Sequence, residues 1–467
     1  MYCHARTTLQ SANKQMNIKN ALNLISDLAS NNRLIFFMLI GTIALLIIDI
    51  SLININRFTT SQSLSGWRTA VFIVIAIVSA IVQFLILKFV KLRSKAARGK
   101  KESSLEITYT AVRVVQFLLI GIFTLAILQI IVTSRYNVYI LVATIGISYT
   151  VAVILMGVLA KRFFSWFKSN KSSVVLLYGL SSAIIAINLG FTIIYVASIL
   201  PTHQLEIRAH TGVGTPFRPP GSAISFLNDV YVVTSVISFM VTWIATAMLL
   251  RHYSQRLGRI KYWVIISIPL AYFLIQFQPL FVNLFYQLLQ SNPTFFSILS
   301  TLIFTFSKPL GGILFGIAFW TTAKKLRKDS VVRDYITIAA YGLILLFVSN
   351  QAIVLVTSPY PPFGLVTTSF VGLSSYLILV GVYSSAISVS EDIKIRQTIR
   401  KFALKESKLL DSIGTSHMED ELQRRVMKLA REQHEVLTQQ TGVEPSLSES
   451  EAKDYLYKVM QEVKKTH

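Results

Sequence analysis

The sequence predicts an all-α protein, a polytopic transmembrane helix bundle of about ten spans with a helical cytoplasmic C-terminal tail. Hydrophobic residues make up 53% of the chain and charged residues only 14%, whereas soluble domains average about 25% charged residues. Apolar stretches of about 20 residues recur, which is the length that a helix needs to cross a hydrocarbon core of about 30 Å. Basic residues gather in alternate gaps between these stretches, as the positive-inside rule requires.

Three regions follow from this pattern. Residues 1–33 are polar and form a cytoplasmic N-terminal segment, 34–389 form the ten-span transmembrane domain, and 390–467 form the cytoplasmic helical tail. The apolar stretches of the middle region read as helices, because backbone groups in lipid must be hydrogen-bonded within their own segment. The predicted spans are 34–53, 69–90, 109–132, 138–160, 173–200, 226–250, 262–285, 295–319, 335–356 and 366–389.

The orientation of the spans follows from the distribution of lysine and arginine. Four gaps on one side of the membrane, together with the N-terminal segment, carry 23 of these residues, and the opposite side carries five. Since basic loops stay in the cytoplasm, we expect both termini to be cytoplasmic and the protein to lie in the cell membrane. Orientation thus accounts for the net charge of +23, and no nucleic-acid partner is expected. The basic gaps are 91–105, 161–171, 251–261 and 320–334.

Lys308 is a charged residue near the middle of the eighth predicted span, and Pro309, Gly311 and Gly312 follow it. Proline removes a helical hydrogen bond and glycine loosens the backbone, so this sequence predicts a broken helix. Irregular backbone at membrane depth needs surrounding protein or a water-filled cavity. We therefore expect spans seven to nine to enclose a polar site around Lys308. The other predicted members of the site are Gln276, Gln278, Asn283, Asn350 and Gln351.

Two interpretations of this group remain open. Ionisable residues inside a membrane often mark a ligand site or an ion pathway. Alternatively, Lys308 and the amides hold helices together, and such contacts contribute only about 1 kcal/mol each. Asp49, near the outer end of the first span, is then the best counter-ion for Lys308, provided that the first and eighth spans pack together.

The sequence contains no recognisable catalytic motif. There is no nucleotide-binding loop, no HExxH, no GxSxG and no pair of carboxylates within the spans. Cys3 is the only cysteine, which excludes an intramolecular disulfide and a cysteine-based metal cluster. The longest outer loop, 201–225, contains His203, Glu206 and His210, but its prolines and glycines argue against a helix that would align them as metal ligands. We expect no enzyme activity, no metal and no cofactor.

The tail contains 14 basic and 14 acidic residues and is therefore electrically neutral. An amphipathic helical pattern begins after the last span, is interrupted at Gly414, and resumes from about Met418 to Leu437. We expect residues 391–440 to pack on the cytoplasmic loops, to self-associate or to bind a cytoplasmic protein, while the lipid bilayer surrounds the spans.

Two stretches of the C-terminal region carry a family resemblance. The strings SSYLILVGVYSSAISVSEDIKIRQTIRK and LLDSIGTSHMEDELQRRV resemble a set of uncharacterised multi-span membrane proteins of ammonia-oxidising archaea. The resemblance implies a membrane location and a cytoplasmic tail. It implies no activity and no functional residue.

Two functions are compatible with these features. The long tail and the short outer loops favour a non-enzymatic sensor or scaffold, in which the spans respond to a cue and the tail contacts a partner. The alternative is a secondary transporter of a small solute, since ten spans with both termini inside divide into a 5+5 inverted repeat. Such a carrier would have a broken helix at the same place in each half, and the third span, the counterpart of the eighth, offers only Gly121.

Overall fold

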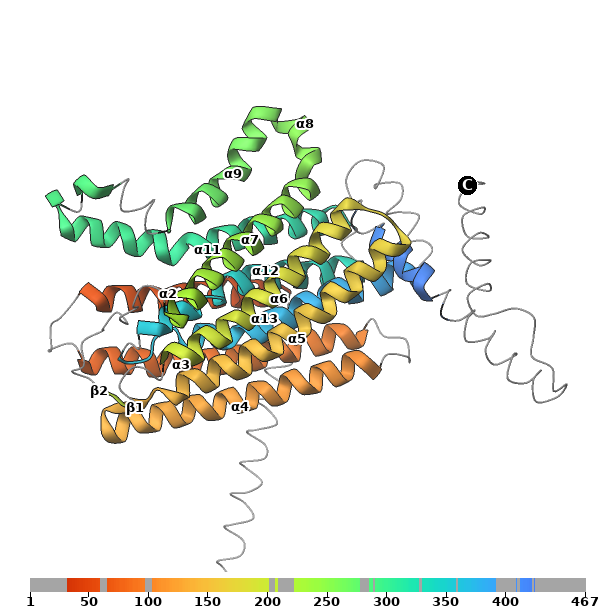
Figure 1. Ribbon diagram of the computed structural model, residues 1–467. Coiled ribbons are helices and arrows are strands. Elements are labelled where there is room, and N and C mark those ends of the chain that lie inside the picture. Colours follow the sequence, from red (N-terminus) through yellow and green to blue (C-terminus); the bar gives the residue numbers. More distant parts are fainter. Residues whose placement is uncertain are drawn as a thin grey trace, which may run out of the picture.

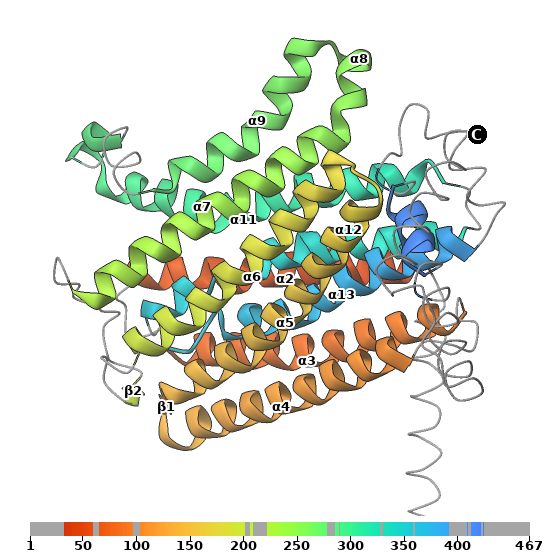
Figure 2. The same cartoon turned by 45° about the vertical axis from the view of Figure 1, so that its right-hand side comes forward.

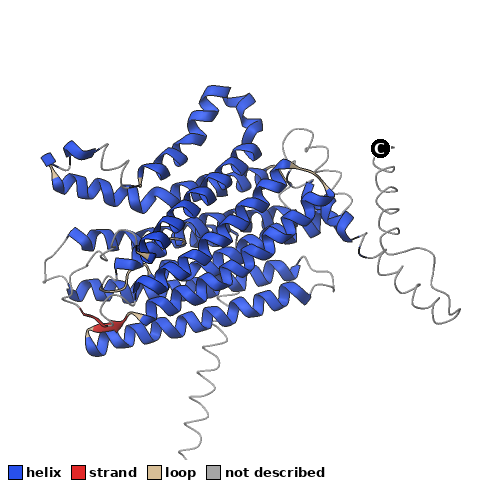
Figure 3. Ribbon diagram, in the orientation of Figure 1, coloured by secondary structure: helices blue, strands red, loops and turns tan. Residues whose placement is uncertain are grey.

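The computed structural model describes most of the predicted transmembrane region and a short part of the tail. The described residues are 32–58, 65–96, 103–200, 206–208, 222–277, 285–288, 290–326, 330–357, 360–391, 409, 412–421 and 424. Long helices lie side by side in a bundle (Figure 1). Within the ranges just given, the only β-structure is a two-stranded sheet at one edge (Figure 3). The prediction of an all-α bundle is confirmed.

Most of the long helices exceed the ~20 residues that a span requires. The long helices are α2 (Asn32–Phe58), α3 (Ser65–Ala96), α4 (Ser103–Thr133), α5 (Tyr139–Ser169), α6 (Ser173–Ile199), α7 (Ala223–Leu250), α9 (Arg259–Ile275), α11 (Pro293–Lys324), α12 (Val331–Ser349) and α13 (Leu365–Glu391). The short elements are η3 (Arg251–Tyr253), α8 (Ser254–Leu257), η4 (Ala352–Thr357), β1 (Arg135–Asn137) and β2 (Glu206–Arg208).

Eight of the described helices are long and apolar enough to cross a membrane, and each coincides with one predicted span. The first predicted span corresponds to a shorter apolar stretch, Phe37–Ile53, within α2. The seventh corresponds to α9, which has 17 residues and ends before the predicted boundary at 285. The chain is therefore a polytopic membrane protein with eight clear spans, and with shorter apolar stretches in α2 and α9, among the residues that the structure describes.

The turn between α4 and α5 carries a feature that the sequence did not predict. Its strand β1 pairs antiparallel with β2, so that Tyr136 lies opposite Ile207. Beside this pair, the guanidinium Nη1 of Arg135 lies 2.6 Å from a carboxylate oxygen of Glu206. The pairing and the ion pair anchor part of the loop that precedes α7 over the α4–α5 turn.

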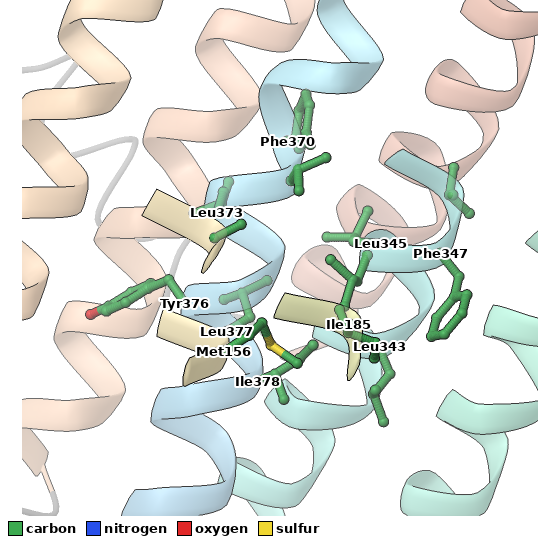
Figure 4. Packing of buried hydrophobic residues seen from close by; sticks show 14 of the residues in the cluster. Met156, Ile185, Leu343, Leu345, Phe347, Phe370, Leu373, Tyr376, Leu377 and Ile378 are labelled. Atoms are coloured by element: carbon green, nitrogen blue, oxygen red, sulfur yellow. The ribbon is translucent and has the colours of Figure 1, made fainter. Parts of the chain in front are cut away.

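Among the eight clear spans, α13 is the most deeply buried. Its 18-residue apolar window is 100% buried, and the helix packs against α12 and α5 as well as α2, α3 and α4 (Figure 2). Figure 4 shows Leu373, Leu377 and Ile378 of α13 among side chains of α5, α6 and α12. By contrast, Leu128 and Val132 on α4 are 62% and 72% exposed, as expected of side chains that face lipid.

The course of α11 corrects the prediction of a broken helix at Pro309, Gly311 and Gly312. The helix runs without interruption through Pro309. Because proline has no N–H, Pro309 cannot donate to the carbonyl of Thr305. That carbonyl instead accepts a long hydrogen bond of 3.5 Å from Nε2 of Gln351, so a neighbouring segment supplies the donor that the helix lacks.

The glycines of α11 allow close packing rather than a break. A Cβ on Gly311 would clash with the ring of Phe239, and one on Gly312 would lie 2.7 Å from the Cβ of Phe347. Real Cβ atoms essentially never approach other heavy atoms within 3.0 Å. Any side chain at these two positions would therefore push α11 away from α7 and α12.

Irregular buried backbone is found instead in the connection between α12 and α13, the ninth and tenth spans, which we call the interrupted segment. This connection contains η4 and ends at Gly364, whose φ of +86° favours glycine. Residues 361–364 are buried, and so are Asn350 and Gln351 at the start of the connection. Buried backbone outside a regular helix needs hydrogen-bond partners from elsewhere in the protein. The polar residues that supply them form the candidate site.

Candidate functional site

Lys308 lies halfway along α11 with its ammonium group inside the bundle, and it is only 7% exposed. Its Nζ donates to the backbone carbonyl of Asn350 at 3.0 Å and to the hydroxyl of Tyr231 at 3.1 Å. At 1.5 Å per residue, Lys308 lies about 24 Å from Lys324 at the basic end of α11. In a hydrocarbon core of about 30 Å, this charge lies at membrane depth and is held by neutral acceptors.

Asn350 gives the contact its electrostatic character, because this residue caps the C-terminal end of α12. The last carbonyls of a helix lack donors within the helix, and the helix dipole places about half a negative charge there. An ammonium group at this position satisfies one such carbonyl and offsets the dipole. For Lys308, the end of a helix therefore takes the place of a carboxylate.

Two tyrosines complete the site, and neither was predicted. Tyr149 of α5 accepts a hydrogen bond from the backbone N–H of Ala352 at 3.3 Å and donates to Oδ1 of Asn350 at 3.3 Å. Tyr231 of α7 accepts from Lys308, and its ring centroid lies 5.4 Å from the ammonium nitrogen. We call Lys308, Asn350, Tyr149 and Tyr231 the lysine site.

The other predicted members lie at its margin. Gln276 accepts a hydrogen bond of 2.7 Å from Oγ of Ser307, so it contacts the residue before Lys308 rather than Lys308 itself. Gln351 donates to the carbonyl of Thr305, which lies about one turn before Lys308 on α11. Two predicted members, Gln278 and Asn283, lie outside the described residues.

Asp49 is not the counter-ion of Lys308, which corrects the expected ion pair. Helices α2 and α11 do pack together, but none of the ion pairs among the described residues joins these two side chains. The fully buried Asp49 instead accepts hydrogen bonds from the backbone N–H of Thr367 at 3.1 Å and from its Oγ1 at 2.7 Å. Thr367 lies in the first turn of α13, so the carboxylate faces the positive end of that helix's dipole.

The two buried charges thus flank the interrupted segment between α12 and α13. Lys308 binds the carbonyl end of α12, and Asp49 binds the amide end of α13. Opposite charges on opposite helix ends stabilise irregular backbone at membrane depth. Chemically, a solute with a carboxylate or hydroxyl group could replace Asn350 as an acceptor for Lys308, and the exchange would release the end of α12.

A second candidate site lies where the tail meets the bundle. Residues 412–421, here called the tail helix, are helical and lie beside the ends of α5 and α13 (Figure 2). Ile413 and Ser416 on this helix are 1% and 0% exposed. The helix continues through Gly414, which corrects the predicted interruption there. The expectation that part of the tail packs on the bundle is met for this segment.

Aromatic rings and one glycine form the contact. The His417 ring lies edge-on to Trp166 of α5 at 6.4 Å and 88°, and to Tyr383 of α13 at 5.7 Å and 81°. A Cβ on Gly414 would lie 2.8 Å from the Cβ of Val389 near the end of α13. Any residue with a Cβ at position 414 would require the tail helix to shift away from α13. We call these five residues the tail contact.

The described residues contain no group of three or more His, Cys, Asp or Glu side chains that could hold a metal ion. No family model, no curated protein and no solved structure matches the chain. The fold and the two sites therefore define its class: an all-α polytopic membrane protein with a polar site inside the bundle and a tail helix packed against the ends of two spans.

Proposed function

We propose that this protein is a non-enzymatic membrane sensor or scaffold in which α13 couples the lysine site to the tail contact. The position of α13 carries the proposal. Asp49 holds its first turn, and Tyr383 and Val389 near its other end belong to the tail contact. Because the helix is enclosed by close-packed neighbours, a displacement at one end is transmitted rather than absorbed.

The contact between Lys308 and Asn350 in the lysine site is the interaction that a cue could break. Lys308 joins α11 to Tyr231 of α7 and to the end of α12, and the interrupted segment links that end directly to α13. A cue that withdraws Lys308 from Asn350 changes where α12 ends and where α13 begins. Coupling of this kind requires an element with two discrete arrangements, and we propose that the interrupted segment is that element.

The basic residues favour a cytoplasmic position for the tail contact. It lies at the end of α5 that carries Lys161, Arg162 and Lys168, and positive charge marks the cytoplasmic side. A tail helix there is accessible to a cytoplasmic protein or to a second copy of the chain. We place both termini in the cytoplasm and the protein in the cell membrane, and we assign it no catalytic activity.

Disulfide cross-linking tests the proposed coupling. The changes Val389→Cys and Gly414→Cys, made with Cys3→Ser, place two Cβ atoms 2.8 Å apart; a disulfide needs about 3.5–4.5 Å, so a small shift suffices. The initial rate of disulfide formation is measured in lipid nanodiscs at one fixed pH. We expect Lys308→Met to change this rate about fivefold, the lower end of typical coupling between sites.

The matched control for this measurement is Leu128→Ala, which shortens a lipid-facing side chain of α4. We expect it to leave the rate unchanged. A rate in Lys308→Met equal to that of this control would contradict the coupling.

One observation favours the alternative, a secondary transporter of a small solute. Transporters bind solutes where helix ends face a site inside the bundle, and here the end of α12 faces Lys308 and the start of α13 faces Asp49. The pair of broken helices expected of an inverted-repeat carrier is missing from the third and eighth spans, since α4 and α11 are both uninterrupted. Labelling of Gln351→Cys with a membrane-impermeant thiol reagent separates the two functions. If the cysteine reacts with reagent added to each face of the membrane, alternating access is indicated. If reagent on at least one face never reaches it, the sensor is favoured.

A further inference from the structure

His417 lies in a setting that favours its uncharged form. The partly exposed ring makes T-shaped contacts with Trp166 and Tyr383, and its Nδ1 is buried with no hydrogen-bond partner among the described residues. A neutral imidazole can leave one ring nitrogen without a proton, whereas the imidazolium carries N–H groups on both nitrogens. Protonation would therefore place a buried donor where the described part of the chain offers no acceptor, which costs free energy.

Burial and the surrounding charges together lower the pKa of His417, which also favours its uncharged form. Burial is the largest influence on the pKa of His417, and the positive charge of Arg162 is the next; both lower that pKa below its ordinary value of 6.5. Carboxylates on the tail helix oppose them, but one of these already pairs with an arginine at 2.9 Å. The groups that act on His417 are Arg162 from α5 and Asp420, Glu421 and Arg424 from the tail.

The aromatic partners could in principle favour a charged imidazolium through cation–π attraction. The face of Tyr383 is already used, because the Arg162 guanidinium lies 5.0 Å from its centroid. A second cation beside it would meet repulsion from the first. Tyr383 therefore favours packing against a neutral His417 over a charged one.

We propose that the tail contact is a proton sensor, in which the tail helix binds the bundle while His417 is neutral and separates from it when His417 is protonated. The inference rests on the proposed function, since it names the cue that acts at the tail contact. Above pH 6.5 the separated tail is uncharged at this position, and binding has its full strength. As pH falls below that value, the ratio of bound to separated tail decreases by up to about tenfold per pH unit, and it levels off below the pKa of the bound form.

Spin labelling tests this inference in the full-length protein. Nitroxide labels are placed at Lys168→Cys, an exposed position on α5, and at Thr415→Cys on the tail helix, both with Cys3→Ser. The distance distribution in lipid nanodiscs is recorded at pH 8 and at pH 5. We expect one short, narrow distribution at pH 8, and longer, broader distances at pH 5. With His417→Gln, which cannot be protonated, we expect the short distribution at both values.

The other possible outcomes contradict either the proton sensor, the tail contact or the role of His417. Short distances in the parent protein at both pH values overturn the proton sensor and leave the tail contact standing. Long distances at both values refute the tail contact, and with it the proposed function. A pH-dependent loss that persists in His417→Gln shows that another group titrates and overturns the role of His417.

Two further variants test the inference if the glutamine of His417→Gln does not pack against the bundle. His417→Phe retains an aromatic ring without a titratable nitrogen, and we expect pH-independent short distances from it. Arg162→Gln removes the cation that disfavours protonation, so the pKa of bound His417 should rise toward that of the free tail. The separation at pH 5 should then be smaller than in the parent protein, and a larger separation would contradict the inference.

Discussion

Lys308 receives its stabilisation from a backbone carbonyl and a phenol, and this choice of partners determines which substitutions should matter. The backbone carbonyl of Asn350 remains whatever side chain stands at position 350. The hydroxyl of Tyr231 belongs to a side chain that mutation can remove. The same distinction applies to Asp49, which accepts from both the backbone and the side chain of Thr367.

We predict that Tyr231→Phe lowers the free energy of unfolding by about 1–2 kcal/mol, because it removes one acceptor from a buried ammonium group at membrane depth. Asn350→Ala should cost less, since it removes only the 3.3 Å hydrogen bond from Tyr149. In a Lys308→Met background, Tyr231→Phe should have almost no effect. The measurement is a double-mutant cycle on unfolding in detergent micelles.

Equal costs of Tyr231→Phe in the presence and absence of Lys308 would show that the hydrogen bond between them is not significant for stability. A larger cost for Asn350→Ala than for Tyr231→Phe would show that Lys308 depends on the Asn350 side chain rather than on the end of α12.

The sequence revealed part of this site and concealed the rest for identifiable reasons. Lys308 and Asn350 were found because polar residues in an apolar run carry a clear cost. Tyr149 and Tyr231 were missed because tyrosine is amphipathic, and the sequence does not show whether its hydroxyl lies at the interface or at depth. The partner of Asp49 was missed because it includes a backbone N–H, which no side-chain pattern reports.

At the scale of elements, hydropathy predicted the spans well and helix continuity poorly. The span positions follow from a length requirement that the bilayer imposes. Continuity depends on contacts between distant segments, such as the hydrogen bond from Gln351 to the carbonyl that Pro309 leaves free in α11. The apolar run of α12 continues into η4, so the ninth span was predicted to extend to residue 356. In the structure α12 ends at Ser349, and the interrupted segment begins there.

Glycines in the helices provide a second prediction at this scale. A Cβ on Gly381 of α13 would lie 2.6 Å from backbone atoms of Ala339 and Tyr335 in α12. Since backbone cannot rotate away, Gly381→Ala should lower the free energy of unfolding by about 1–3 kcal/mol. Gly121→Ala in α4, where no atom lies within 4 Å of the new Cβ, should raise it by up to about 1 kcal/mol through helix propensity.

Thermal unfolding of the two variants in the same detergent checks this contrast. If Gly381→Ala were as stable as Gly121→Ala, α12 and α13 would not be packed as closely as the structure places them. The enclosure of α13, on which the proposed coupling depends, would then be in doubt.

For the whole molecule, the distribution of polar groups matters more than the number of spans. The two buried charges each face a helix end, and both lie next to the segment that joins α12 to α13. The tail helix packs near the other end of α13. The amphipathic pattern of the tail predicted that it would pack on the protein, but not which residues it would contact. Hydropathy could not predict that α13 is enclosed, because a buried helix and a lipid-facing helix have the same apolar composition.

Hydrogen exchange tests most directly whether α13 couples its two ends. Thr367→Val removes the 2.7 Å hydrogen bond to Asp49 in the first turn of α13, about 36 Å along the helix from Glu391. We predict faster amide exchange in residues 412–421 of this variant in lipid nanodiscs, and no change in Leu128→Ala. Faster exchange confined to the start of α13, with residues 412–421 as protected as in the parent protein, would contradict the coupling.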